Sequence, residues 1–288
     1  MTAVRSDVAG GSQSVPSAEP VLETAGLRKE FGELVAVEDV SLRVRAGGSL
    51  AIVGESGSGK TTVAKLIVGL ERPTAGTIRA CGRDRSTPAR TTAERRSRGR
   101  EVQIVFQDPY TSLDPRQTVE RTLDEILRLH RRDLDAEGRR ARVRELGELV
   151  GLDPRQLRAL PRALSGGQRQ RVAIARALAA EPRVLILDES VAALDVSIQA
   201  QVLNLLADIR DETGISYVLI SHDLAVVRQL TEETIVMWRG AVVERGPTAR
   251  VLDAPEDDYT KRLRASVPRP GWKPRRRSAA AIEGGTRT

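Results

Sequence analysis

Residues 50–70 read LAIVGESGSGKTTVAKLIVGL, in which a short apolar run meets a glycine-rich turn and then a helical pattern. Gly54 to Thr61 match the pattern G-x-x-x-x-G-K-[ST] in the context that this motif requires, after a strand and at the start of a helix. The glycines let several backbone N–H groups face one phosphate, and the start of the helix adds a favourable dipole. The stretch therefore predicts a nucleoside triphosphate site.

Two segments supply the predicted ligands of this site. Lys60 offers a compact positive charge to the β- and γ-phosphates, and Thr61 offers a hydroxyl to Mg²⁺. A buried strand with the sequence VLILDE then ends in Asp188, which can help hold the metal, and Glu189, which can accept a proton from the attacking water. The predicted nucleotide-binding run is Gly54, Glu55, Ser56, Gly57, Ser58, Gly59, Lys60, Thr61 and Thr62.

A third motif, LSGGQ at 164–168, leads directly into a predicted helix. Ser165 can cap that helix, and Gln168, three residues later, completes a capping box. The amide groups of the first turn and the helix dipole form a second surface that attracts phosphate, separate from the first.

Strands alternate with helices along most of the chain, which predicts an α/β core with a partly parallel sheet. From Val21 the apolar residues alternate with polar ones, as in antiparallel strands. Pro-rich breaks and amphipathic helices at 108–180 indicate an inserted helical subdomain between core segments 21–107 and 181–251. We expect residues 1–20 to form a flexible leader and 252–288 a C-terminal extension with a basic tail.

Composition narrows the possible functions. The 288 residues include 46 Lys or Arg and 39 Asp or Glu, giving a net charge of 46 − 39 = +7, and much of the excess falls at 83–100 and 269–277. We interpret these stretches as a solvated linker and a disordered tail, with contact to nucleic acid or anionic lipid as the alternative. Aromatic residues, at 2%, are too sparse to favour base stacking.

Three further features of the sequence bear on the cellular compartment of the protein. No apolar run reaches the roughly 18 residues needed to cross a bilayer. Residues 1–20 contain no apolar segment typical of a secretory signal. Cys81 is the single cysteine, so intramolecular disulfides and a cysteine-ligated metal cluster are excluded.

Six motifs in fixed order resemble those of the nucleotide-binding subunit of an ABC transporter. They are GxxxxGKT, VFQDP at 105–109, LSGGQ, LILDE at 185–189, ALD at 193–195 and SHD at 221–223. The resemblance covers about 21–251 and implies a P-loop NTPase core with an antiparallel β subdomain and an inserted helical subdomain. The runs FQDPYTSLDPRQTV and SGGQRQRVAIARAL are similar to those of ATPase subunits that drive dipeptide and oligopeptide importers.

The resemblance also implies roles for residues outside the phosphate loop. Phe31 would stack on adenine, Gln107 would contact the metal or the attacking water, and His222 would contact the γ-phosphate. Ser165, Gly166, Gly167 and Gln168 would reach the ATP held by a second cassette, with Asp195 near that interface.

The implied assembly uses ATP and Mg²⁺ and is peripheral to the cytoplasmic face of the membrane. Its expected partners are a second ATPase subunit, of the same or a different chain, transmembrane permease subunits and, indirectly, an extracytoplasmic solute-binding protein; no nucleic acid is expected. Asp257-Asp258-Tyr259 lacks the histidine–proline pair typical of peptide importers. Nickel or another small solute therefore remains an alternative cargo, as does, less favoured, an ABC ATPase that acts on nucleic acid or ribosomes.

Overall fold

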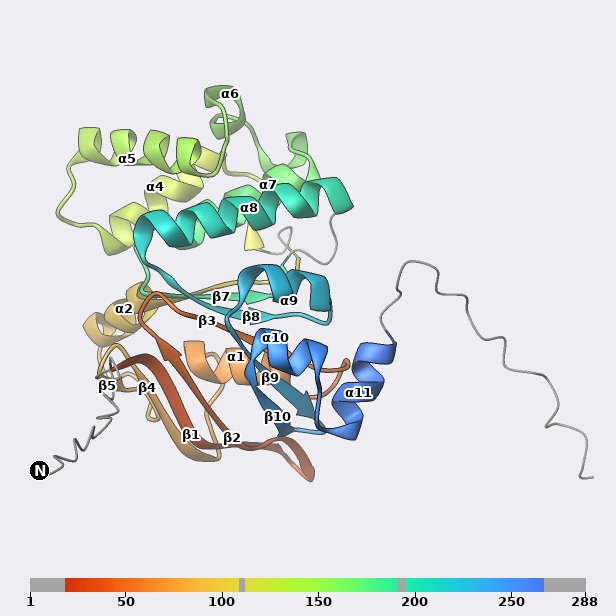
Figure 1. Cartoon of the computed structure of the whole chain (residues 1–288). Helices are drawn as coiled ribbons and strands as arrows, with labels where there is room; N and C mark the ends of the chain where they lie inside the picture. The colour runs from red at the N-terminus through yellow and green to blue at the C-terminus, as the bar shows by residue number, and fades with distance from the viewer. Residues whose placement is uncertain (1–18, 109–111, 191–194, 267–288) are drawn as a thin grey trace, which may run out of the picture.

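The computed structural model describes residues 19–108, 112–190 and 195–266. Two sheets share the core, and helices cover them (Figure 1). Residues 1–18 of the expected leader (1–20) lie outside the described residues, as do the basic stretch 269–277 and most of the ALD motif. The predicted leader runs too far, because strand β1 (Pro20–Phe31) already begins at Pro20.

The first sheet is antiparallel, with the strand order β2-β1-β4-β5. Its strands are β1 (Pro20–Phe31), β2 (Leu34–Arg45), β4 (Ala75–Ala80) and β5 (Arg83–Asp84). Inward-facing side chains such as Leu22, Val40 and Leu42 are buried, which confirms the alternation expected from the sequence.

The second sheet has the order β10-β9-β3-β8-β7-β6, and all neighbours are parallel except the hairpin β9–β10. Its strands are β3 (Ser49–Val53), β6 (Val102–Val105), β7 (Val184–Asp188), β8 (Ser216–Ile220), β9 (Glu233–Trp238) and β10 (Ala241–Pro247). Every residue of β3, β7 and β8 is buried, as the continuous apolar runs indicate. In the sequence, Thr234–Met237 and Ala241–Glu244 indicate two strands that turn at Arg239–Gly240, and the pairing of β9 with β10 confirms this predicted hairpin.

Helices lie on both sides of this sheet (Figure 1). They are α1 (Lys60–Val68), α4 (Val119–His130), α5 (Ala136–Leu149), α6 (Pro154–Leu157), α7 (Gly166–Leu178), α8 (Val196–Thr213), α9 (Leu224–Leu230), α10 (Thr248–Asp253) and α11 (Asp258–Ala265). A short 3₁₀ helix at Pro161–Ala163 precedes α7. In the sequence, an apolar stripe predicts a helix here, with Gly214 as its stop; the stripe is Ile198, Val202, Leu205 and Ile209. Helix α8 confirms both, and Gly214 ends it with φ 66°.

The arginine-rich stretch 83–100 is not a linker, so that interpretation was wrong. It forms β5 and most of α2 (Thr92–Glu101), which packs beside β6. Arg85 is 7% exposed and pairs with the carboxylate of Glu101. The Arg83 guanidinium lies 3.3 Å from the same carboxylate. Ion pairs, rather than an apolar stripe, hold this helix in place, and hydrophobic periodicity therefore gave no sign of it.

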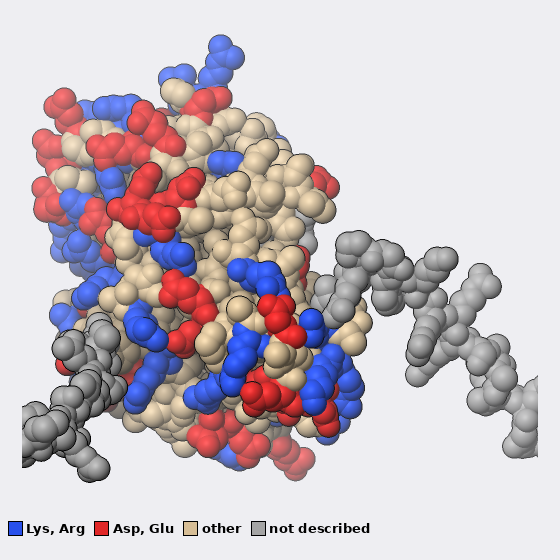
Figure 2. Space-filling model, viewed as in Figure 1, with Lys and Arg blue, Asp and Glu red and all other residues tan. Residues whose placement is uncertain are grey.

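Charge is unevenly spread on the visible face (Figure 2). Acidic and basic side chains are mixed over α4 and α5, whereas the surface over the first two thirds of α8 carries few charges. Residues 196–207 of α8 include no charged side chain. Among the described residues, no helix combines the length and the hydropathy that a membrane span needs.

Candidate active site

The site forms where the parallel strands end. The phosphate loop (54–59) follows β3, Asp188 is the last residue of β7, and His222 comes two residues after β8. Because β3, β8 and β7 are adjacent and parallel, these segments meet at one edge of the sheet. The carboxyl edge of such a sheet is the usual ligand site of an α/β fold.

A cleft of about 470 Å³ opens beside the phosphate loop. It combines loop residues with the turn between β1 and β2 and the turn between β9 and β10. The sequence-predicted residues that line it are Phe31, Ser56, Gly57, Gly59, Lys60, Thr61, Thr62 and Glu189. Six of the nine residues of the predicted nucleotide-binding run 54–62 therefore line one cleft, together with Phe31 and Glu189.

Glycine is required at both ends of the phosphate loop. A Cβ atom added to Gly54 (φ 152°) would lie 2.2 Å from the carbonyl oxygen of Met237. A Cβ atom added to Gly59 (φ 99°) would lie 2.3 Å from the carbonyl oxygen of Ala36. The loop is therefore packed against β9 and β2 so closely that a side chain at either position would displace backbone.

Lys60 lies inside the loop and is 5% exposed. Its ammonium donates hydrogen bonds to the carbonyl oxygens of Gly54 and Glu55, each at 2.8 Å. Burial lowers the pKa of Lys60, although the carboxylates of Glu189 and Asp188 oppose that shift. A cation held by two neutral carbonyls in a buried position is suited to bind an anion that enters the cleft.

Thr61 and Asp188 bring two hard oxygen atoms together. The Thr61 hydroxyl donates a hydrogen bond of 3.3 Å to the Asp188 carboxylate, which is 4% exposed. Burial raises the pKa of Asp188, and the hydrogen bond from Thr61 lowers it in part. A buried carboxylate beside a hydroxyl provides the oxygen ligands that Mg²⁺ prefers, so the residues present fit this metal.

Glu189 and His222 lie next to each other above this pair. The His222 Nδ1 atom is 3.5 Å from a carboxylate oxygen of Glu189, and His222 is the more exposed of the two. The backbone of Glu189 has φ 47°, and its amide donates to the carbonyl oxygen of Ile220 on β8. This conformation, uncommon for a residue with a side chain, is held by the neighbouring strand and is typical of functional positions.

Gln107 is exposed just after β6, the edge strand beside β7. Val105 pairs with Leu187 where β6 and β7 run side by side. Gln107 lies two residues beyond Val105, and Glu189 lies two residues beyond Leu187. The strand pairing therefore places Gln107 at the same edge of the sheet as the two carboxylates.

The LSGGQ motif forms the start of α7, and its capping box is confirmed. The Gln168 amide donates to the Ser165 hydroxyl at 3.3 Å, and the Ser165 amide donates to the Gln168 side chain at 2.8 Å. Within the part of the chain that the structure describes, this helix start does not line the phosphate cleft. The fold thus presents two separate surfaces suited to phosphate.

Gly167 has a structural role that the motif alone does not reveal. A Cβ atom at this position would lie 2.4 Å from a methyl group of Ile198 on α8. The second glycine of the motif therefore lets α7 pack against the first turn of α8, close to Asp195, the residue that precedes that helix.

Sequence reasoning missed two residues next to the cleft. Arg239 lines it from the hairpin turn with φ 49°, and its guanidinium lies over the Trp238 ring at 4.5 Å. Tyr259, from the C-terminal extension, accepts a hydrogen bond of 2.9 Å from the amide of Glu55. The hairpin prediction placed Arg239 in a turn, but no local pattern showed which cleft that turn would face.

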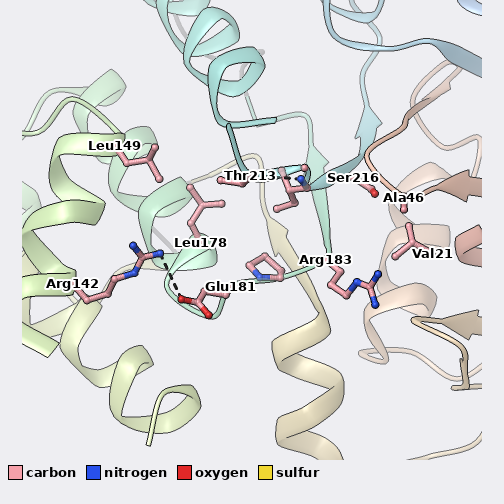
Figure 3. A pocket seen from close by; sticks show the side chains of 12 residues that line it. Val21, Ala46, Arg142, Leu149, Leu178, Glu181, Arg183, Thr213 and Ser216 are labelled. Carbon is pink, nitrogen blue, oxygen red and sulfur yellow. Dashed lines mark hydrogen bonds and ion pairs between the residues drawn. The ribbon is translucent and has the colours of Figure 1, made fainter. Parts of the chain in front are cut away.

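A second cavity, also of about 470 Å³, lies away from the phosphate loop. It opens near the amino-terminal ends of β7 and β8, where Arg142 extends toward Glu181 (Figure 3). It contains none of the predicted site residues.

Comparison with known proteins identifies the chain's family. A family model described as "ABC transporter" matches residues 37–192, more than half of the chain. The chain belongs to the ABC transporter family. A solved dimeric, post-hydrolysis structure of the ATP-binding cassette MJ0796, bound to ADP and Pi, aligns with a TM-score of 0.71 at 30% identity over 79% of this chain and 98% of that one. This neighbour confirms the expected P-loop cassette fold.

Curated relatives of this ABC cassette are named for peptide transport. The oligopeptide transport ATP-binding protein OppD of Mycobacterium tuberculosis is 47% identical over 244 residues, which cover 85% of this chain but 39% of the relative. The dipeptide transport ATP-binding protein DppF of Haemophilus influenzae is 42% identical over 261 residues, 87% of this chain and 79% of that one. The cassette thus spans about two fifths of the length of the mycobacterial relative.

Proposed function

We propose that this chain binds and hydrolyses ATP as a subunit of a membrane ABC transporter that imports dipeptides or oligopeptides. The observation that carries the proposal is the cluster at the carboxyl edge of the sheet, where Lys60, Thr61, Asp188 and Glu189 come together beside one cleft. Groups suited to bind phosphate, to hold a metal ion and to accept a proton lie together there, which supports phosphoryl transfer to water.

The phosphates would enter beside Lys60, whose ammonium would exchange the carbonyls of Gly54 and Glu55 for phosphate oxygens. Phe31 is well placed for the adenine, because its ring lines the cleft and is 44% exposed. The Lys29 ammonium lies 4.6 Å from the centre of the same ring and supports its orientation.

Thr61 and Asp188 would hold Mg²⁺, with Gln107 as a further oxygen ligand or as the group that orients the attacking water. When bound, the metal would neutralise charge that develops on the phosphate oxygens. The Asp188 carboxylate is already buried and oriented by its hydrogen bond to Thr61, so little rearrangement of these two side chains is needed.

Glu189 would act as the general base and take a proton from the attacking water. His222, 3.5 Å away, would orient this carboxylate and contact the γ-phosphate. The backbone hydrogen bond from Glu189 to Ile220 fixes the position of the carboxylate relative to β8, which carries His222 at its end.

A second cassette would complete the site. The start of α7, with Ser165, Gly166, Gly167 and Gln168, would reach the ATP held by the partner's phosphate loop, and Asp195 would lie near the interface. The dimeric state named for MJ0796 supports such a pairing. ATP would then favour the closed pair through contacts that neither chain makes alone.

The names of the relatives support the proposed cargo. Both named relatives are peptide transport ATP-binding proteins, which favours dipeptides or oligopeptides over nickel or another small solute. Permease subunits, reached through the helices at 108–180, would hold the cassette at the cytoplasmic face of the membrane, and a solute-binding protein would act on the other side.

We propose that the chain is divided into a cassette at 21–251 and a C-terminal extension from 252.

The substitution Glu189→Gln tests the proposed chemistry. We expect ATP binding to persist and the hydrolysis rate to fall by about a hundredfold or more, because the amide cannot accept the proton. Glu137→Gln, on the distant helix α5, is the control and should leave the rate unchanged. Hydrolysis by Glu189→Gln at nearly the wild-type rate would exclude Glu189 as the base.

A further inference from the structure

The C-terminal extension folds back beside the phosphate loop. Its anchor is Glu244 on β10, whose carboxylate accepts hydrogen bonds from the amides of Glu256 at 3.0 Å and Asp257 at 3.2 Å. Glu244 is 8% exposed, so this anchor is buried. The Asp257 carboxylate in turn accepts the amides of Tyr259 and Thr260 and caps α11. The chain of contacts fixes the first turn of α11 against the hairpin β9–β10.

Tyr259 is the residue that this anchor orients. It is 5% exposed, and its ring stacks on Trp238 with 5.6 Å between ring centres. At its tip, the hydroxyl accepts the hydrogen bond of 2.9 Å from the backbone amide of Glu55, the second residue of the phosphate loop. An aromatic ring packed on one side and bonded at its tip has little freedom to move.

The hairpin holds the same loop at a second point. The Gly240 amide donates to the carbonyl oxygen of Ser58 at 3.1 Å, and Gly54 packs directly on the carbonyl of Met237. The phosphate loop is therefore bound near both its start and its end by the segment that runs from β9 to α11. Within that segment, the Tyr259 hydroxyl is the group that comes from the extension.

We propose that Tyr259 is a positioning residue of the nucleotide site: its hydroxyl fixes the start of the phosphate loop in the conformation that binds nucleotide. The C-terminal extension then contributes to nucleotide binding by the cassette. This inference rests on the proposed function, because it concerns the same site. Since coupling between two sites is reciprocal, bound nucleotide must also stabilise α11.

The variant Tyr259→Phe tests the proposal in the full chain. It removes the hydroxyl and keeps the ring on Trp238. We expect the Kd for Mg²⁺-ADP, measured by calorimetry, to rise about threefold to tenfold, the usual effect of one lost hydrogen bond. The matched control is Tyr217→Phe, which removes a buried hydroxyl that donates to the carbonyl of Leu206 at 2.7 Å, near the opposite edge of the sheet. We expect this control to lower thermal stability and leave the Kd unchanged.

Hydrogen exchange distinguishes a positioning role of the Tyr259 hydroxyl from a purely structural one, because only the positioning role links the exchange rates in α11 to bound nucleotide. In the wild type, Mg²⁺-ADP should slow the exchange of amides in α11 (Asp258–Ala265), and Tyr259→Phe should remove that response. A purely structural hydroxyl would instead speed exchange equally with and without ADP. An unchanged Kd in Tyr259→Phe, or a nucleotide response that survives it, would overturn the inference. A wild-type chain that binds no ADP would refute the proposed function itself, and the inference with it.

Discussion

The fold buries the charged side chain of Lys60 even when no phosphate is bound. Its ammonium is bound by two backbone carbonyls, and burial lowers its pKa. Neutral carbonyls compensate only partly for the lost hydration of a charge. The incomplete compensation at Lys60 therefore destabilises the folded chain, and binding of an anion would remove this destabilisation.

The variant Lys60→Met follows from this reasoning. We expect the affinity for Mg²⁺-ATP to fall by about a hundredfold, because two or more charge-assisted hydrogen bonds are lost. Stability without nucleotide should stay the same or rise, because the buried charge is gone. Lys65→Met, an exposed position on the same helix, is the control and should change neither quantity. A Lys60→Met chain that binds ATP as tightly as the wild type would contradict the role given to this residue.

At the scale of single elements, α2 and α4 meet through a histidine. His130 is the last residue of α4, and its ring lies against Gly99 of α2, where a Cβ atom would be 3.7 Å from the ring. Burial lowers the pKa of His130, and the guanidinium groups of Arg100 and Arg96 lower it further. The folded chain therefore disfavours the protonated ring at this contact.

A pH dependence of stability follows. The pKa of His130 is lower in the folded chain than in the unfolded one, so the unfolded chain binds more protons below about pH 6.5. The free energy of unfolding therefore decreases as the pH is lowered from about 6.5 to the pKa of His130 in the folded chain. We expect His130→Gln to lose less stability than the wild type between about pH 7.5 and about pH 5.5 in thermal unfolding. Equal losses in the two chains would show that His130 does not titrate in this way.

The elements that periodicity could predict were those that bury apolar residues. The runs at β3, β7 and β8 and the stripe of α8 predicted their elements closely, because burial itself sets their pattern. Helix α2 was missed because ion pairs stabilise it. The hydrogen bond from Glu55 to Tyr259 joins residues 204 positions apart, and no local pattern encodes such a contact.

The site was more predictable than its surroundings. The spacing of GxxxxGKT and the carboxylates at the end of a buried strand placed Lys60, Thr61, Asp188 and Glu189 correctly at one edge, because parallel strands bring their ends together. Arg239 reaches the cleft through the turn between β9 and β10, and its position depends on how that hairpin packs against the loop.

At the scale of the whole molecule, the two phosphate-attracting surfaces lie apart. The start of α7 does not line the phosphate cleft within the described part of the chain, so one chain alone does not bring Ser165 into the cleft beside Lys60. The uncharged first part of α8 (196–207) lies beside the start of α7, because Gly167 packs against Ile198. We expect a second copy of this chain to be able to supply the missing half.

Mixing two inactive variants tests the shared site most directly. Ser165→Arg blocks the helix start and keeps Lys60, whereas Lys60→Met keeps the helix start and loses the phosphate ligand. We expect each variant alone to hydrolyse ATP poorly, and an equimolar mixture to recover a clear fraction of the wild-type rate, because mixed pairs contain one complete site. A mixture as inactive as its components, or Ser165→Arg alone at the full wild-type rate, would contradict the claim that two copies of this chain build each site.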